Sequence, residues 1–169
     1  MQIGVIADTH GHLATGALEA LHGVELILHA GDIGAEAIIA RLEQVAPVLA
    51  VHGNTDAGTV LARQHPAMRR IEHEGLRIHL THIGGSPAQI ARSLPHEPEL
   101  RPHVYIFGHS HIALLERHAD VLFLNPGAAG QPRFSGGLSV ALLRVAAGHA
   151  EAEIIALPTR SSGAHNAGT

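Results

Sequence analysis

Five short apolar runs in the first two thirds of the chain each lead into a polar motif, and this repeated pattern restricts the fold most strongly. The apolar runs cover residues 3–7, 26–28, 48–51, 78–80 and 104–107. The motifs are, in chain order, Asp8-Thr9-His10, Gly31-Asp32, Gly53-Asn54, Thr81-His82 and Gly108-His109-Ser110-His111. The run at residues 3–7 is apolar on both faces, which is typical of a strand in a covered parallel sheet. If all five are strands, their carboxyl ends bring three histidine motifs, two aspartates and an amide to one edge of a sheet.

The first third of the chain alternates between strand-like and helix-like segments. Strands are expected at residues 3–7, 24–29 and 47–52, and helices at residues 13–21 and 36–45. Gly23 is expected to end the first helix. This β-α-β-α-β order predicts parallel strands joined by right-handed crossovers.

The rest of the chain is expected to be mainly strand. Residues 69–74 and 76–82 should pair as a hairpin around Gly75. Residues 59–66 could form a short helix or a loop, and Pro87 suits the first turn of a helix at 87–94. Further strands are expected at residues 103–107, 112–118, 121–124, 138–145 and 150–157. About ten strands exceed what one small open sheet carries, so two packed sheets with helices outside are expected.

Length and composition favour one folded domain over residues 1–157, followed by a frayed tail of small polar residues at 158–169. With 46% hydrophobic but only 2% aromatic residues, the core must be aliphatic. The absence of cysteine excludes disulfides and thiolate metal ligands. No apolar stretch approaches the roughly 20 residues of a membrane span, and no signal peptide is visible, so a cytoplasmic protein without a membrane partner is expected.

The charge pattern limits the kinds of partner. A net charge of −4 without a run of basic residues argues against an extended nucleic-acid surface. A small nucleotide-derived substrate stays compatible with this charge. The sequence leaves open whether the chain forms a homo-oligomer.

Together the motifs supply seven oxygen and nitrogen donors: Asp8, His10, Asp32, Asn54, His82, His109 and His111. Seven donors are more than one metal ion needs and about right for two ions that share a bridging carboxylate. On an extended backbone, Asp8 and His10 would project to the same side, and so would His109 and His111. Asp32 is the natural bridge, because each of its two carboxylate oxygens can bind one ion.

Each motif alone also has an ordinary explanation. Asp-x-His is common in turns and helix caps, and Gly-Asp and Gly-Asn are ordinary turn dipeptides. Most of the histidines outside the motifs are interpreted as surface or packing residues. What favours a shared metal site is that all five motifs occur at expected strand ends.

This ordered set resembles the signature of the calcineurin-like metallophosphoesterases: Asp-x-His, Gly-Asp, Gly-Asn, His and Gly-His-x-His. The resemblance covers about residues 1–157 and is to the small single-domain bacterial and archaeal phosphodiesterases, a branch that includes the retromer's metallophosphoesterase-like subunit. Asn125-Pro126-Gly127 and Gln131-Pro132-Arg133 match a further feature of that branch. The resemblance implies an α/β fold, a four-layer αββα sandwich of two mixed β-sheets with flanking helices.

The resemblance also implies a dinuclear site with two divalent metal ions per chain. By analogy with the family, one ion would bind Asp8, His10, Asp32 and His111, and the other would bind Asp32, Asn54, His82 and His109. Mixed nitrogen and oxygen donors suit Mn²⁺ first, with iron, Zn²⁺ and Ni²⁺ as alternatives.

One departure from the family pattern concerns the leaving group. Many relatives carry a histidine directly after the Gly-Asn asparagine, where it stabilises or protonates the leaving group, but this chain has Thr55 and then Asp56. Threonine cannot act as an acid near neutral pH, so esters with weakly basic leaving groups should react fastest. Asp56 could orient a neighbouring ligand or only shape the turn. Arg133 could hold a non-bridging phosphate oxygen or form a surface salt bridge.

The expected function is therefore that of a metal-dependent phosphoesterase, above all a phosphodiesterase, in which a metal-bridging hydroxide attacks phosphorus. Its expected substrate is a small phosphate ester. The residues expected to act in catalysis are Asp32, Asn54, His109 and Arg133. Two other functions stay open: a non-catalytic, metal-binding scaffold for protein contacts, and a protein with a single structural ion.

Overall fold

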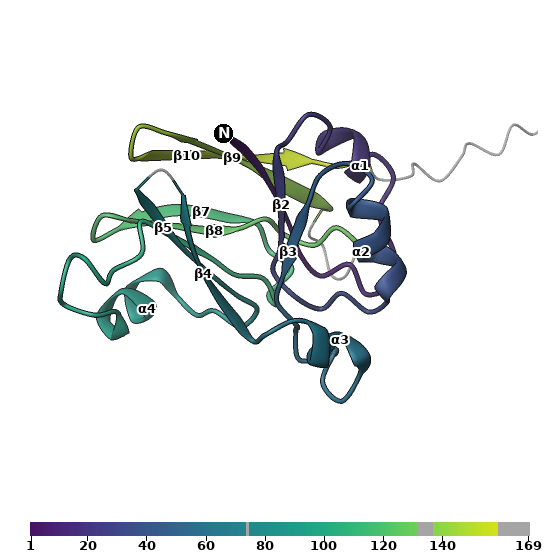
Figure 1. Ribbon diagram of the computed structural model, residues 1–169, viewed down its shortest axis with the longest axis horizontal. Coiled ribbons are helices and arrows are strands. Elements are labelled where there is room, and N and C mark those ends of the chain that lie inside the picture. Colours follow the sequence, from purple (N-terminus) through teal and green to yellow (C-terminus); the bar gives the residue numbers. More distant parts are fainter. Residues whose placement is uncertain (74, 132–136, 159–169) are drawn as a thin grey trace, which may run out of the picture.

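The computed structural model describes residues 1–73, 75–131 and 137–158, and these form two mixed five-stranded β-sheets (Figure 1). The first sheet has the strand order β10-β9-β1-β2-β3. Its strands are β1 (Gln2–Ile6), β2 (Leu26–His29), β3 (Val48–Ala50), β9 (Ser139–Ala146) and β10 (His149–Ala156). β1, β2 and β3 are parallel, as the alternating sequence pattern predicts, whereas β9 is antiparallel to both β1 and β10.

The second sheet has the strand order β4-β5-β6-β8-β7. Its strands are β4 (Met68–His73), β5 (Leu76–Thr81), β6 (Val104–Ile106), β7 (Leu114–His118) and β8 (Val121–Asn125). β5, β6 and β8 are parallel, and β4 and β7 are antiparallel strands at the two edges. The predicted hairpin is confirmed, because β4 and β5 are antiparallel neighbours with His73 opposite Leu76.

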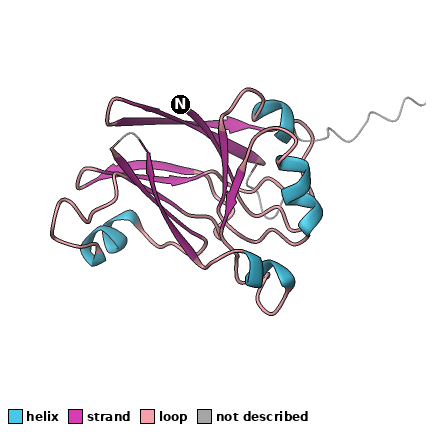
Figure 2. Cartoon of the chain, viewed as in Figure 1, coloured by secondary structure: helices cyan, strands magenta, loops and turns pink. Residues whose placement is uncertain are grey.

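Helices cover the outer faces of the two sheets, which gives the predicted αββα layers (Figure 2). The helices are α1 (Ala17–Ala20), α2 (Glu36–Leu42), α3 (Val60–Gln64) and α4 (Pro87–Ser93). α1 and α2 pack on the first sheet, and α4 packs on the second. Among the described residues, no helix has the length and apolar character needed to cross a membrane.

The buried side chains alternate between two faces of the second sheet. Ile106 points between the sheets, where it belongs to the same aliphatic cluster as Val5 of the first sheet. Tyr105 and Phe107, its neighbours in sequence, point to the other face and pack with Phe123 beneath α4. The central core is therefore aliphatic, as predicted, while the rings of Tyr105, Phe107 and Phe123 gather in the outer layer.

Several predicted boundaries are wrong. The helix expected at 13–21 is limited to α1, because Gly16 has a φ of 82° and a helix can begin only after that left-handed residue. The ambiguous segment 59–66 contains α3, and the Thr59 side chain caps this helix by accepting a hydrogen bond from the backbone N–H of Leu61 at 3.2 Å. The strand expected from residue 112 begins at Leu114. Of the expected tail, residues 159–169 lie outside the described part of the chain.

Candidate metal centre

The loops that follow β1 and β2 lie side by side and carry the first two motifs. Backbone hydrogen bonds join them in register: the N–H of Asp8 donates to Gly31, that of His10 to Asp32 and that of Gly11 to Ile33, over 2.8–3.0 Å. The parallel pairing of β1 and β2 therefore continues beyond the ends of the strands. It brings the side chains of Asp8, His10 and Asp32 to one edge of the sheet.

The backbone at these residues is not extended, which corrects the expectation that strand alternation aligns their side chains. Five of the seven expected ligands have positive φ values: Asp8 (54°), His10 (47°), Asp32 (54°), His109 (72°) and His111 (60°). Residues other than glycine rarely adopt this left-handed conformation, which costs roughly 1–3 kcal/mol each when the surroundings enforce it. The other described non-glycine residues with positive φ are Ala119, Asp120 and Ala147, in two hairpin turns. Left-handed turns, not strand alternation, aim the ligands.

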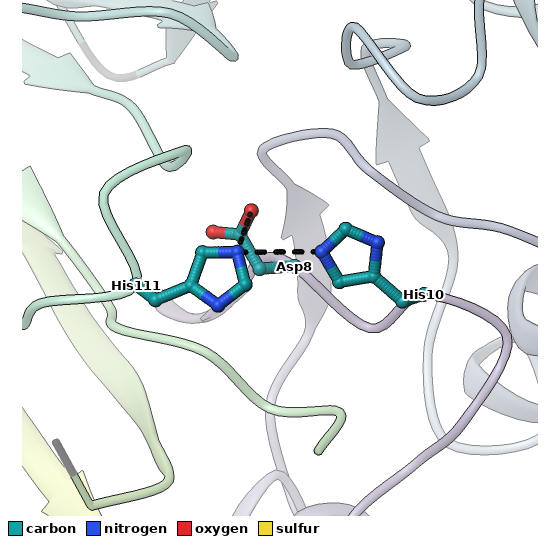
Figure 3. A group of neighbouring side chains, drawn as sticks. All are labelled: Asp8, His10 and His111. Atoms are coloured by element: carbon teal, nitrogen blue, oxygen red, sulfur yellow. Dashed lines mark hydrogen bonds and ion pairs between the residues drawn. The ribbon is translucent and has the colours of Figure 1, made fainter. Parts of the chain in front are cut away.

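Asp8, His10 and His111 form the first group of possible ligands (Figure 3). The Nε2 atom of His111 lies 3.3 Å from Oδ1 of Asp8 and 3.3 Å from Nε2 of His10. In addition, the backbone N–H of His109 donates to Oδ2 of Asp8 at 3.0 Å, which fixes the carboxylate between the two loops. Two imidazole nitrogens and a buried carboxylate oxygen that face one another make a suitable set of donors for a cation.

His82 anchors the second group, which also contains Asp32, Asn54 and His109. Its Nδ1 atom donates a hydrogen bond to the carbonyl of Ala30 at 2.7 Å, so Nε2 is the ring nitrogen that faces the other residues of the group. Nε2 lies 3.0 Å from Oδ1 of Asn54 and 3.4 Å from Oδ2 of Asp32, and Oδ1 of Asn54 also lies 3.0 Å from Nδ1 of His109. A proton on Nε2 can bridge to these oxygens, and a divalent cation bound to the neutral ring could take the place of that proton.

The Asp32 carboxylate, a member of the second group, also faces His10 of the first group. Its Oδ2 atom is 3.7 Å from Nε2 of His10 and 3.4 Å from Nε2 of His82, while Oδ1 accepts a hydrogen bond from the backbone of Thr55 at 2.9 Å. Burial raises the pKa of Asp32, but the hydrogen bonds from His82 and Thr55 outweigh burial and hold it well below its usual range. Burial lowers the pKa of His82, but its hydrogen bonds to Asp32 and the Ala30 carbonyl outweigh burial and raise it. The carboxylate is therefore charged and can act as a ligand for a cation.

Asp56 joins the Asp32 turn to the Asn54 turn. Its buried carboxylate accepts three backbone hydrogen bonds, from Ile33 at 3.0 Å, Gly34 at 2.9 Å and Gly53 at 2.8 Å. The residue thus shapes its own turn and also sets the distance between two loops that carry possible ligands. The sequence left open whether Asp56 shapes the turn or orients a neighbouring ligand, and these three hydrogen bonds allow it to do both.

The sequence analysis missed a buried pair behind the site, His29 and Thr9. The Nδ1 atom of His29 accepts from the Gly31 N–H at 3.2 Å, and Nε2 donates to the Thr9 hydroxyl at 2.9 Å, which donates to the Ile33 carbonyl at 3.0 Å. This series of hydrogen bonds connects β2 to Thr9, the residue between Asp8 and His10. A buried histidine at the end of an otherwise apolar strand was the signal that could have revealed it.

The Asn-Pro-Gly feature supports the histidines of the last motif. The fully buried side-chain amide of Asn125 donates to the Gly108 carbonyl and to the Ser110 hydroxyl, both at 3.0 Å, and its oxygen accepts from the Gly127 N–H at 2.9 Å. Arg133, the expected phosphate-binding residue, lies outside the described part of the chain.

Comparison with known proteins identifies the family. The family model for the calcineurin-like phosphoesterase superfamily domain matches residues 1–148 of the sequence. The chain belongs to this superfamily. The resemblance carried by the five motifs is therefore confirmed, and the family implies a hydrolase that uses divalent metal ions.

Two relatives of this chain show how far the similarity extends. A probable metallophosphoesterase of Methanothermobacter thermautotrophicus is 37% identical over 161 residues, which are 92% of each chain. A phosphodiesterase of Methanocaldococcus jannaschii is 28% identical over 145 residues, which are 75% of this chain and 83% of that protein.

Two solved structures share the fold of this chain. An archaeal phosphodiesterase superposes with a TM-score of 0.74 at 25% identity, covering 92% of this chain and 100% of that chain. Vps29 of Entamoeba histolytica in complex with Zn²⁺ superposes with a TM-score of 0.72 at 20% identity, covering 92% and 99% of the two chains. At that identity the second likeness shows the fold alone.

Proposed function

We propose that this protein is a phosphodiesterase with two divalent metal ions in one site. Asp8, His10, Asp32 and His111 would hold one ion, and Asp32, Asn54, His82 and His109 would hold the other. The observation that most supports this proposal is the position of Asp32. Its Oδ2 atom lies within 3.7 Å of Nε2 of His10 in the first group and of Nε2 of His82 in the second. Ions bound here would lower the pKa of a water molecule towards about 7 and supply hydroxide for attack on phosphorus.

The protein residues hold this donor set in place before any substrate arrives. The Ala30 carbonyl selects the tautomer of His82, the backbone of Thr55 orients Asp32, and the backbone of His109 orients Asp8. Preorganised ligands need no rearrangement at the moment of reaction, which is the main protein contribution in sites of this type. Mn²⁺ is the first metal to test.

Phosphodiesters are favoured over monoesters by the charge that the site can balance and by the relatives. The relative from Methanocaldococcus jannaschii and the archaeal protein of known structure are both named phosphodiesterases. With two divalent ions, the carboxylates of Asp8 and Asp32 and one hydroxide, the site would carry a net charge of about +1, which matches the single negative charge of a diester, whereas a monoester carries nearly two at neutral pH. The side chain of Thr55, which replaces the histidine of many relatives, offers no proton to a strongly basic leaving group.

The test uses Mn²⁺-supplied protein and bis(p-nitrophenyl) phosphate. Wild-type protein should hydrolyse this diester, and Asp32→Ala and His109→Ala should each reduce kcat by at least about a thousandfold, because both change the ion-binding set. Asp120→Asn, in the exposed turn between β7 and β8, is the control and should keep wild-type turnover. Near wild-type turnover in either alanine variant would refute the proposal.

Elemental analysis of the same samples separates the remaining alternatives. Two ions per chain together with turnover support the proposal. Two ions per chain without turnover would identify a scaffold of the same fold, and one ion per chain would identify a single-ion protein.

A further inference from the structure

Two large apolar side chains stand exposed at the rim of the metal centre. Ile83 is 57% exposed and directly follows His82, and Ile112 is 67% exposed and directly follows His111. Among the described residues, these are the two most exposed of the large hydrophobic side chains. Exposing apolar surface next to a ligand-binding site is unfavourable in the free protein and becomes favourable when a ligand covers it.

A hollow of about 420 Å³ opens beside Ile112 and shares His109 with the proposed metal site. Its other walls include Gly84, Phe107 and Leu114. The volume lies within the range of about 300–1,000 Å³ that is typical of small-molecule sites. The hollow is therefore large enough for a ring-sized organic group attached to a phosphate held by the metal site.

The hollow is apolar and lacks charge. Among the described residues, none that line it is an aspartate, glutamate, lysine or arginine. The polar side chains in its wall are already engaged within the protein: Asn125 bonds to Gly108 and Ser110, and Ser86 bonds to Gln89. A charged group placed here would lose its water without gaining a partner, so a neutral apolar group is favoured.

Glycine backbone and an aromatic ring form part of the wall, and both suit contact with a planar ring. A Cβ atom on Gly84 would overlap the ring of Phe107, so the backbone of Gly84 lies directly against that ring. Gly85 and Gly108 also line the hollow, and neither projects a side chain into it. Glycine backbone allows close approach of a ligand, as a flat aromatic group requires.

A second, smaller hollow of about 180 Å³ lies next to the loop that follows β5. Asn54, His82 and Ile83 line this smaller hollow, whereas Gly84, the residue after Ile83, lines the larger one. Its volume lies below the usual range of about 300–1,000 Å³ for a small-molecule site, so it has room only for a small substituent. Two unequal hollows beside one phosphate site match the two ester groups of a diester.

We infer that the larger hollow binds an aromatic ester group of the phosphodiester substrate, such as an aryl group or the base of a nucleoside, and that Ile112 is a specificity-determining residue. This inference rests on the proposed function. It assigns the substrate class: monoanionic diesters with one planar aromatic group and one smaller group.

The first experiment compares diphenyl phosphate with dimethyl phosphate as competitive inhibitors of bis(p-nitrophenyl) phosphate hydrolysis. Both are monoanions, so their different inhibition constants report the ester groups and not the charge. Diphenyl phosphate should bind at least about tenfold more tightly, which corresponds to about 1.4 kcal/mol. In Ile112→Ser the ratio of the two inhibition constants should fall by about threefold or more, because an apolar wall of the hollow is lost.

Leu100→Ser is the matched control. Leu100 is 56% exposed, nearly as much as Ile112, but lines neither hollow. This variant should keep the wild-type ratio of inhibition constants. Loss of the ratio in both variants would show a general effect of removing surface apolar groups and would overturn the inference.

The second experiment reads binding without turnover. In methyl-labelled protein, diphenyl phosphate should shift the NMR signal of the Ile112 δ1 methyl group through the ring current, with and without added metal, and dimethyl phosphate should not. Absence of this shift, or equal inhibition by the two ligands within about twofold, would overturn the inference. Absence of any hydrolysis by wild-type protein would instead overturn the proposed function, while the methyl signal would still report whether the hollow binds a ring.

Discussion

Replacing Asp56 by asparagine should loosen the connection between the Asp32 and Asn54 turns. Oδ2 of Asp56 accepts from Ile33 and Gly53, and Oδ1 accepts from Gly34. The amide oxygen of asparagine can keep the two bonds of Oδ2, but its NH₂ group then faces the N–H of Gly34, donor to donor. One charge-assisted bond is lost and two become neutral, so the free energy of unfolding should fall by about 2–4 kcal/mol.

Thermal unfolding of metal-free protein in chelator measures this effect without a contribution from metal binding. For a chain of this length, a loss of about 2–4 kcal/mol corresponds to a fall in Tm of roughly 5–15 °C. Asp120→Asn is again the control, because this exposed turn residue has a φ of 66°, which asparagine tolerates well. A Tm within about 1 °C of wild type in Asp56→Asn would refute the reasoning, since a buried three-bond acceptor cannot be lost at so small a cost.

Three further predictions concern the supports of the site. In Gly53→Ala the new Cβ would overlap the Asp32 carboxylate, so metal content by elemental analysis should fall, whereas Gly137→Ala, where the space is open, should bind normally. Burial lowers the pKa of His29 from 6.5 to about 3. Between pH 6.5 and pH 3 the unfolded chain therefore binds a proton at His29 that the native protein does not bind. The free energy of unfolding should fall by about 1.4 kcal/mol for each unit by which the pH is lowered in this range. Urea unfolding of His29→Asn should lack this part of the pH dependence, and an unchanged slope would contradict the assignment. Thr59→Ala removes the cap of α3 and should cost about 1 kcal/mol in urea unfolding; no measurable change would show that the cap contributes nothing.

The larger elements of the fold were predictable because their signals are local. The apolar runs that become β1, β2 and β6 are continuous in sequence, and burial on both faces of a covered sheet leaves that pattern. Helix ends were less predictable. The leucine spacing at 13–21 suggested a helix, but the left-handed Gly16 confines α1 to residues 17–20, and Leu13 is buried in a loop instead.

The expected ligands were found from residue type and order, while their supports were not. Asp8, His10 and Asp32 share a local motif with a glycine or threonine, which the sequence displays directly. The carboxylate of Asp56 binds backbone that is 22–23 residues earlier, and His29 reaches Thr9 across 20 residues. Nothing in the neighbouring sequence specifies such partners, because they depend on how the loops pack.

The sequence by itself determined which residues stand at the ends of the strands and, through parallel crossovers, that these ends share one edge of the two sheets. Only the tertiary structure decided how the side chains meet. Left-handed conformations at five of the expected ligands are unfavourable for an isolated chain, and they persist because backbone hydrogen bonds between separate loops enforce them. The apolar hollows beside His82 and His109 likewise exist only where distant segments come together. Hydrophobic patterning acts along the chain, whereas the geometry of a site is set by contacts across it.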